Sequence, residues 1–453
     1  MYKKSIKLLC LLIALMLTMS LAACGSKSSN EDSQKPAGES KEGSKVETSK
    51  EGSAEEPAEK NVTLRIYSYY SDDAKIAFDQ TVEYMKKIMP NVTIELEQRV
   101  DADETKLKTF AAVGNMPDIF ESWGSVIRTF QKSGDIAMLD DALGEYSFLD
   151  RVVDSVKPTL YDEDGHCYAV NATPPTNALI YYNSKVFEEN GVKVPENYDE
   201  FLTAVKKFSA KGIIPLALFA QEKWPGVQLY DLLVTRFEPK GYKGIEKGET
   251  DITDPAYKKA AKRLAELVDA GLISKSAFST NASQAFELFK TGRAAMIVNG
   301  SWYLSECATY GDHIGYLDNP LADPADVKAT MGNRSGGNSI GMWSVAAKSK
   351  HLNIAIEACM NWAIENARAR IVKLGYPNTL TEEVKPEKPR AAIQEKYSES
   401  LSKVVTTTCF PWMLENNEFK TALEESVENL IAGGYTADEF IDYMKTITDE
   451  HVK

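Results

Sequence analysis

Residues 62–67 read Val-Thr-Leu-Arg-Ile-Tyr, and this alternation of apolar and polar side chains predicts a strand with one buried face. Apolar residues then recur at helical intervals between 77 and 88, before a second alternating stretch at 92–96. A helix at about 104–113 leads to a third expected strand at 117–120. This β-α-β-α-β order predicts a mainly parallel sheet with helices on both faces.

Candidate binding loops follow from this arrangement. Ligands of open parallel sheets bind beyond the carboxyl ends of the strands. The segments 69–73 and 121–125 directly follow the first and third expected strands. Loop position alone therefore selects Tyr69, Tyr70 and Glu121 as polar ligand contacts.

The second half of the chain also alternates between helices and strands. A helix is expected at 198–210, where the apolar residues share one face, and strands are expected at 213–219 and 294–298. The pattern at 254–271 predicts a helix with an aspartate N-cap, a proline in its first turn and a glycine at its end. Residues 436–439 form a capping-box pattern before a C-terminal helix.

Composition and charge limit the possible partners. The chain has 453 residues, a formal net charge of −14 and 43% hydrophobic residues, which is ordinary for a globular protein. Its length suggests two domains after an N-terminal leader. Binding of nucleic acid requires clustered lysine and arginine, so the acidic balance argues against a nucleic-acid partner.

The N-terminus has the pattern of a secretory signal, with lysines before an apolar run at about 8–17 and small residues before Cys24. This pattern resembles the lipobox of bacterial lipoproteins, which implies that residues 1–23 are removed and that Cys24 carries a lipid. The alternative is a plain signal peptide with an incidental cysteine, and the apolar run is short for a transmembrane helix. Residues 24–60 contain a single large apolar side chain and are expected to form a disordered tether.

Four cysteines remain after this leader, and their spacing lacks the close pairing of a zinc site. They allow three disulfide pairings that the sequence does not distinguish, and we expect mostly buried free thiols. The four histidines form no metal-binding spacing, and the sequence has no Walker loop or Gly-x-Gly-x-x-Gly run, so neither a metal nor a cofactor is expected. These residues are Cys167, Cys307, Cys359 and Cys409, and His166, His313, His351 and His451.

Several short motifs follow one another along the chain. They are Pro117-Asp118-Ile119, residues 164–168 (Asp-Gly-His-Cys-Tyr), residues 180–187 (Ile-Tyr-Tyr-Asn-Ser-Lys-Val-Phe), residues 198–201, residues 289–296, residues 299–302 (Asn-Gly-Ser-Trp) and Gly336-Gly337 before a strand and a helix at about 352–365. Their order resembles the extracellular solute-binding proteins of sugar-importing ABC transporters, the maltose-binding-protein-like group. The resemblance extends over nearly all of residues 61–453, and it rests on the order because each motif alone is weak.

The resemblance implies a two-lobe α/β fold of the type II periplasmic-binding-protein class, with a hinge between the lobes. By analogy, the N-terminal lobe contains residues 61–168 and 335–378, and the C-terminal lobe contains residues 169–334 and 379–453. A solute between the lobes would favour the closed state because it contacts both of them.

The resemblance also implies a function and its partners. We expect the substrate-binding lipoprotein of an ABC importer, which captures a mono- or oligosaccharide and delivers it to permease subunits that work with a cytoplasmic ATPase. The protein is expected to act as a monomer, held by its lipid at the extracytoplasmic face of the cell membrane.

The residue types fit a carbohydrate. A sugar ring presents C–H bonds on its faces and hydroxyls at its edge, so a site needs flat aromatic rings beside hydrogen-bonding side chains. Four of the six tryptophans fall where this family builds its cleft, whereas Trp362 is expected in the core, Trp343 in core or hinge packing, and Asp118 in a turn. The candidate ligand contacts are Tyr69, Tyr70, Glu121, Trp123, Asn177, Trp224, Trp302, Asn338 and Trp412.

Two alternatives stay open. A lipid-anchored glycosidase would need two carboxyl groups across the scissile bond, but no motif marks such a pair and no catalytic residue is assigned. A binding protein for a peptide, a polyamine or a phosphorylated polyol would keep the fold and change the solute. A polyamine would need clustered carboxylates in the cleft, and a phosphate would need arginine or lysine there.

Overall fold

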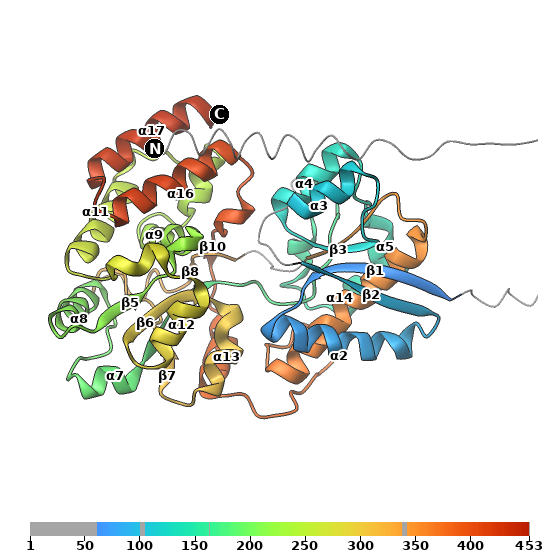
Figure 1. The fold of residues 1–453 in the computed structure, drawn as a ribbon, viewed down its shortest axis with the longest axis horizontal. Helices are drawn as coiled ribbons and strands as arrows, with labels where there is room; N and C mark the ends of the chain where they lie inside the picture. Colours follow the sequence, from blue (N-terminus) through green and yellow to red (C-terminus); the bar gives the residue numbers. More distant parts are fainter. Residues whose placement is uncertain (1–60, 100–104, 163, 338–341, 453) are drawn as a thin grey trace, which may run out of the picture. The chain divides into compact units, whose positions relative to one another are not determined.

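The computed structural model of the protein describes residues 61–99, 105–162, 164–337 and 342–452. Within these ranges the chain forms two lobes, each built on its own four-stranded sheet with its own hydrophobic core (Figure 1). The expected signal peptide, the lipidation candidate Cys24, the tether and Asn338 lie outside the described residues.

The first lobe contains a sheet with the strand order β2-β1-β3-β9. β1 pairs in parallel with β2 along its whole length and with β3 on its other side, which confirms the parallel arrangement predicted from the opening residues. β9 comes much later in the chain and pairs antiparallel with β3. The strands are β1 (Val62–Tyr69), β2 (Val92–Arg99), β3 (Ile119–Ser122) and β9 (Met342–Val345).

Alternate residues of this sheet face two layers of helices, as the pattern of residues 62–67 predicts. Leu64 and Ile66 pack in a core with α2 (Asp72–Ile88) and α14 (Leu352–Leu374), which lie side by side (Figure 1). Tyr67 and Phe120 pack instead with α3 (Thr105–Ala112) and α4 (Gly124–Ser133). Three short elements complete the lobe: α5 (Asp140–Glu145), α6 (Phe148–Arg151) and the 3-10 turn η1 (Lys157–Leu160).

The second lobe contains a sheet with the strand order β5-β6-β4-β7. β5 is parallel to β6, whereas β4 is antiparallel to both β6 and β7. A separate two-stranded pair, β8 with β10, joins segments that are distant in sequence. The strands are β4 (Ala178–Asn183), β5 (Ile214–Ala217), β6 (Ala294–Gly300), β7 (Ile314–Tyr316), β8 (Asn333–Arg334) and β10 (Thr406–Thr407).

Helices pack on this second sheet in two groups. One core includes α8 (Tyr198–Ala210), α9 (Trp224–Val234), α10 (Gly241–Glu246), α11 (Pro255–Asp269), α16 (Asn417–Ile431) and α17 (Ala437–His451). A smaller core includes α12 (Ala282–Lys290), α13 (Leu304–Thr309) and α15 (Ala392–Leu401). The remaining elements are α7 (Ser184–Glu189) and the 3-10 turns η2 (Ala220–Glu222), η3 (Lys275–Ser279), η4 (Ser301–Tyr303) and η5 (Pro411–Met413).

The helix boundaries mostly follow the sequence signals. α8 has the predicted bounds, and Thr436 with Glu439 forms the predicted capping box of α17. Asp254 occupies the N-cap position of α11, but its side chain makes no capping bond, which corrects that detail. Its carboxylate accepts a hydrogen bond from the backbone N–H of Asp251 at 3.3 Å and so closes the preceding turn instead.

The chain crosses between the lobes more than once, as the resemblance implies. It leaves the first lobe before β4, returns between β8 and β9, and crosses again between α14 and α15. Bridges from Val170 to Trp343 and from Asn177 to Gly336 pair the first two crossings. The exact lobe boundaries stay predictions.

The four cysteines after the leader are buried free thiols, as predicted. Burial raises the pKa of the Cys167 thiol to about 12, and it also raises the thiol pKa of Cys307, Cys359 and Cys409. These thiols are therefore protonated at neutral pH and inert as nucleophiles.

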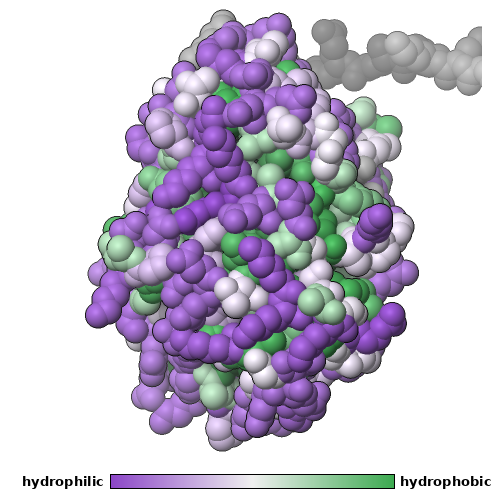
Figure 2. Space-filling view, turned by 90° about the vertical axis from the view of Figure 1, so that its left-hand side faces the viewer, coloured by the Kyte–Doolittle hydropathy of each residue, from purple (hydrophilic) through white to green (hydrophobic). Residues whose placement is uncertain are grey.

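The surface in Figure 2 is dominated by hydrophilic residues, with apolar residues scattered between them. Over the described ranges, no helix combines the length and the apolar character that crossing a membrane would require.

Candidate binding site

Three candidate tryptophans meet at the ends of elements in the second lobe. Trp224 is the first residue of α9, Trp302 lies in η4 directly after β6, and Trp412 lies in η5. Phe410, just before η5, contacts all three rings. We call Trp224, Trp302, Phe410 and Trp412 the aromatic cluster.

The rings of the aromatic cluster contact one another at several angles. Phe410 and Trp412 stack face to face, with 4.6 Å between ring centroids and 4° between ring planes. Trp224 meets Trp412 edge-on at 5.3 Å, and Trp302 lies 5.2 Å from Phe410. Phe410 is buried and the three indoles are half-buried. The indoles therefore retain aromatic area that a ligand can cover.

Local backbone chemistry holds these indoles in place. Gly300 ends β6, and a Cβ at this position would overlap the ring of Trp302. Glycine thus permits the close approach of the indole to the strand end. Trp224 is fixed by a hydrogen bond from its Nε1 to Glu222 Oε2 at 3.1 Å and by edge-on contact with Phe219.

A polar group lies at the carboxyl ends of the three parallel strands of the first lobe. Glu121 is buried, accepts a hydrogen bond from the backbone N–H of Tyr69 at 2.9 Å and pairs with Arg99 at 3.7 Å. The Arg99 guanidinium also lies 4.3 Å from the ring centroid of Trp123, a cation–π arrangement. The charge of Glu121 is therefore compensated within the protein.

The loop between β1 and α2 contains unpaired polar atoms. Tyr70 donates a hydrogen bond from its hydroxyl to Asp79 at 2.7 Å, which ties this side chain to α2. Ser71 Oγ and Asp73 Oδ2 are buried and have no hydrogen-bond partner among the described residues. Burial raises the pKa of Asp73, and the charge of Arg370 and a hydrogen bond between Ser305 and this carboxylate oppose the shift. Because buried polar atoms are normally paired, these two atoms could accept or donate to a bound polar molecule.

Asn177 lies at the first crossing between the lobes and is buried. Its Oδ1 accepts a hydrogen bond from the hydroxyl of Tyr397 at 3.2 Å. Its Nδ2 has no partner among the described residues. The amide therefore has one donor group free for a ligand.

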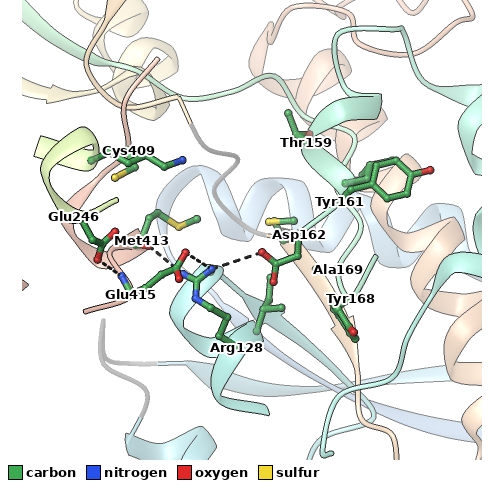
Figure 3. A pocket seen from close by; sticks show the side chains of 15 residues that line it. Arg128, Thr159, Tyr161, Asp162, Tyr168, Ala169, Glu246, Cys409, Met413 and Glu415 are labelled. Atoms are coloured by element: carbon green, nitrogen blue, oxygen red, sulfur yellow. Dashed lines mark hydrogen bonds and ion pairs between the residues drawn. The ribbon is translucent and has the colours of Figure 1, made fainter. Parts of the chain in front are cut away.

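A cavity of about 170 Å³ lies between the lobes next to η5 (Figure 3). Arg128 of α4 forms ion pairs there with Glu415 at 2.7 Å and with Asp162 at 3.6 Å. It also donates a hydrogen bond to the carbonyl of Met413 at 3.3 Å, and Ser125 donates to the carbonyl of Trp412 at 3.3 Å. These contacts link α4 of the first lobe to the segment that carries Phe410 and Trp412.

The structure gathers the predicted contacts into adjoining sets. Trp412 packs against the core cluster that contains Trp123, so the aromatic cluster adjoins the polar group at the end of the first sheet. Trp343 and Trp362 are core residues, as expected. The Asp118 side chain accepts hydrogen bonds from the Arg65 N–H of β1 and from the Ser349 hydroxyl after β9, so it links distant segments instead of fixing a turn. The second lobe contributes Trp224, Trp302 and Trp412, the first lobe contributes Tyr69, Tyr70, Glu121 and Trp123, and the crossing contributes Asn177.

Several residues of the site were not predicted. Phe410 stands two residues before Trp412, and this i, i+2 aromatic pair is a signal that could have found it. Arg99 lies at the end of β2, beyond the predicted end of that strand. Ser71 and Asp73 fall within a predicted binding loop, but nothing in the sequence marks their side chains as unpaired.

The chemistry of the site suits a molecule with both apolar faces and hydrogen-bonding groups. Among the side chains that the structure describes, no group of three or more His, Cys, Asp and Glu is placed to hold a metal ion. The site offers half-buried aromatic faces, an internally compensated carboxylate and unpaired hydrogen-bonding atoms. Such a set can cover apolar ring faces and pair with hydroxyl groups.

Comparison with known families decides the assignment of the chain. The sequence pattern of the bacterial extracellular solute-binding proteins matches residues 72–369, more than half of the chain. The protein belongs to this family. The two-lobe fold, with its two sheets and repeated crossings, agrees with that membership.

Relatives in this family have similar sequences over part of their length. An uncharacterized ABC transporter extracellular-binding protein of Pyrococcus horikoshii is 25% identical over 53% of this chain and 55% of its own length. The multiple sugar-binding protein of Streptococcus mutans is 26% identical over 67% of this chain and 71% of its own. The match thus spans little more than half of the Pyrococcus protein.

Solved structures resemble the chain over most of its length. A chitin oligosaccharide binding protein is 25% identical, covers 86% of this chain and 99% of its own, and superposes with a TM-score of 0.73. A solute-binding protein in complex with raffinose is 20% identical, covers 85% of this chain and 99% of its own, and gives a TM-score of 0.64. The likeness to the raffinose-bound protein concerns the fold alone.

Proposed function

We propose that this extracellular solute-binding protein captures a carbohydrate between its lobes and delivers it to the permease of an ABC importer. The observation that carries the proposal is the aromatic cluster, three half-buried indoles beside Phe410 at strand and helix ends. Indole faces match the C–H faces of a pyranose, and the unpaired atoms of Ser71, Asp73 and Asn177 match its hydroxyls.

Relatives support the same class of solute. The similar protein of Streptococcus mutans is named for multiple sugars, and a similar protein of Bacillus subtilis is named for melibiose, raffinose and stachyose. Arg99 and Glu121 compensate each other, so this pair offers no free charge to a polyamine or a phosphorylated polyol. Membership of a family of solute-binding proteins supports binding, rather than glycoside hydrolysis, as the proposed role.

The expected affinity suits capture and release. Two or three aromatic faces contribute about 1–2 kcal/mol each, and several hydrogen bonds contribute roughly 1 kcal/mol each. The immobilisation of the ligand offsets part of this sum. A dissociation constant on the order of 1 μM, roughly −8 kcal/mol, is therefore expected.

A thermal-shift screen against a glycan library tests the solute. A carbohydrate present at about 100 times its dissociation constant stabilises the folded protein by about 2.7 kcal/mol, so the melting temperature should rise by several degrees. Spermidine and a phosphorylated polyol serve as comparison ligands. A shift with either of these, and none with any glycan, would reject carbohydrate as the solute.

We further propose that the chain is a monomeric lipoprotein, with the lipid on Cys24 and residues 24–60 as a tether. In a host that processes lipoproteins, the Cys24→Ser variant should move from the membrane fraction to the soluble extracytoplasmic fraction. The reason is that a serine has no thiol to accept the lipid. Fractionation followed by immunoblotting measures this, with Cys10→Ser as the matched control, and a Cys24→Ser variant that stays with the membrane would contradict the anchor.

A further inference from the structure

Asp231 is a fully buried carboxylate within the second lobe. It lies on α9, the helix that begins with Trp224. α10 packs directly against it at Gly241, which has a φ of +59°, and a Cβ at Gly241 would overlap the carboxylate. Both the backbone conformation and this contact therefore require glycine beside Asp231.

Three donors converge on the Asp231 carboxylate. Oδ2 accepts hydrogen bonds from the hydroxyl of Ser335 at 2.7 Å and from the hydroxyl of Thr408 at 2.5 Å. Oδ1 accepts from the backbone N–H of Tyr242 at 3.2 Å. Asp231 thus acts only as an acceptor, which is the role of an ionised carboxylate.

The orientation of the Ser335 and Thr408 hydroxyl groups is fixed by a second hydrogen bond to each oxygen. Ser335 Oγ accepts a hydrogen bond from the side-chain amide of Gln228, and Thr408 Oγ1 accepts from the backbone N–H of Gly336 at 2.9 Å. Each hydroxyl therefore points its own proton at Asp231. A protonated carboxyl or an amide at this position would leave at least one of the three donors, the two hydroxyls and the Tyr242 N–H, without its acceptor.

The two partners lie on segments with different roles. Ser335 and Gly336 lie where the chain leaves β8 and crosses back to the first lobe, and Gly336 bridges to Asn177 of the first crossing. Thr408 lies two residues before Phe410 and four before Trp412. One carboxylate thus joins the crossing between the lobes to the segment that bears two rings of the aromatic cluster.

We propose that Asp231 is a positioning residue of the binding site. Its ionised carboxylate fixes the position of Phe410 and Trp412 relative to the crossing between the lobes. The effect on affinity rests on the proposed carbohydrate function, whereas the placement of the rings does not. Protonation of Asp231 should loosen the aromatic cluster and weaken ligand binding.

Asp231 titrates within an accessible pH range. Burial raises its pKa to about 6, against the opposing effects of the Thr408 and Ser335 hydroxyls, the Tyr242 N–H and the charge of Arg236. Burial also lowers the pKa of Arg236 to about 10, so this neighbour stays charged at pH 5–8. The other titratable groups facing Asp231 are Tyr230 on α9, Tyr242 on α10, Tyr257 on α11 and Cys409, and burial raises the pKa of each so that all stay neutral.

Glu246 on α10 is a second buried carboxylate near this segment. It faces Cys409, and burial raises its pKa as well. Its carboxylate accepts hydrogen bonds from the backbone N–H groups of Glu415 and Asn416, just beyond η5. A pH response of the aromatic cluster could therefore arise at either carboxylate. The variants Asp231→Asn and Glu246→Gln separate the two sources.

Stability and affinity should depend on pH in opposite directions. Since the folded-state pKa of Asp231 is raised, its contribution to stability is fully present below its unfolded pKa of about 4 and is lost as the pH rises through about 6. Affinity should instead fall as the pH drops, by about tenfold at one unit below the pKa, because binding then requires loss of the proton. A purely structural role would not produce this opposition.

The test follows near-ultraviolet circular dichroism and ligand affinity of the purified protein from pH 8 to pH 5. The wild type should show a spectral transition near pH 6 without ligand, together with the tenfold loss of affinity. Asp231→Asn should lack the transition and bind weakly at every pH. The control Asp323→Asn, which removes a carboxylate that pairs with Arg263 and Lys259 in the same lobe, should keep the wild-type profile.

Three other outcomes also test the proposal. A transition that persists in Asp231→Asn and vanishes in Glu246→Gln overturns it. If Asp231→Asn does not fold, Thr408→Val keeps the approximate shape of the side chain and removes both the hydrogen bond donated to Asp231 and the one accepted from Gly336. An unchanged spectrum and affinity in that variant also overturn the proposal. If the wild type binds no carbohydrate at any pH, the proposed function fails, and the ligand-free spectral transition still decides the role of Asp231.

Discussion

Replacing Trp302 by alanine is expected to weaken carbohydrate binding at least tenfold while the protein stays folded. The Trp302 indole is half-buried, lies 5.8 Å from Trp224 and 5.2 Å from Phe410, and rests on the strand end at Gly300. Its removal deletes one ring face, worth about 1–2 kcal/mol in contact with a sugar, and also removes support for the neighbouring rings. Isothermal titration calorimetry with the best glycan from the screen measures the change.

Two control variants make this expectation specific. Trp302→Phe keeps an aromatic face and should recover part of the affinity. Phe278→Ala removes an exposed aromatic side chain in η3 of the same lobe and should bind like the wild type. Equal affinity in Trp302→Ala and in Phe278→Ala would remove Trp302 from the site.

The opening of the fold was predictable because its signals are local. Alternation at residues 62–67 places Leu64 and Ile66 on one face of β1, and these residues do pack against α2 and α14. The β-α-β-α-β order then determines the parallel pairing of the first three strands. The antiparallel addition of β9 depends on a return of the chain from the other lobe, and no local pattern at β9 specifies its partner.

The length of α14 shows where local signals fail. The helix was expected to end near Glu365, but it continues to Leu374 and ends where Gly375 adopts a left-handed φ of +71°. Glu365 is buried, and it pairs with Arg151 at 3.4 Å and with Arg368 at 2.7 Å. The two arginines compensate the charge of Glu365 inside the protein, and Arg151 comes from α6, a segment that is distant in the sequence.

The meeting of three tryptophans agrees with the positions that the resemblance gave them, whereas their role in binding stays a prediction and their polar neighbours were not predicted. Trp224, Trp302 and Trp412 were placed through the resemblance, since nothing in their spacing predicts that the three indoles meet. Arg99 reaches Glu121 and Trp123 because the ends of three strands converge in the folded sheet. This convergence is a property of the sheet and is not visible in the local sequence around Arg99. Asp231 could not be distinguished in the sequence from the many exposed carboxylates, because its importance comes from three donors on three other segments.

Replacing Trp362 by alanine is expected to cost about 3–5 kcal/mol of folding free energy, the range for the loss of a large buried aromatic side chain. Trp362 is fully buried in α14, and its ring meets Phe78 at 4.9 Å and Trp343 at 5.6 Å, both at steep angles. The alanine variant should therefore melt roughly 10 °C lower. Thermal denaturation followed by circular dichroism measures this, and a melting temperature within a degree of the wild type would contradict a core role.

Trp362→Phe tests the polar atom of the same side chain. The Trp362 Nε1 is buried and has no hydrogen-bond partner among the described residues, and an unpaired buried donor costs about 1–3 kcal/mol. Phenylalanine removes this unpaired donor, which favours folding, and also part of the buried ring, which disfavours it. The loss of folding free energy should therefore be well below that of the alanine variant. Because Trp362 lies outside the aromatic cluster, the folded fraction of either variant should bind carbohydrate with wild-type affinity, the reverse of the behaviour expected of Trp302→Ala.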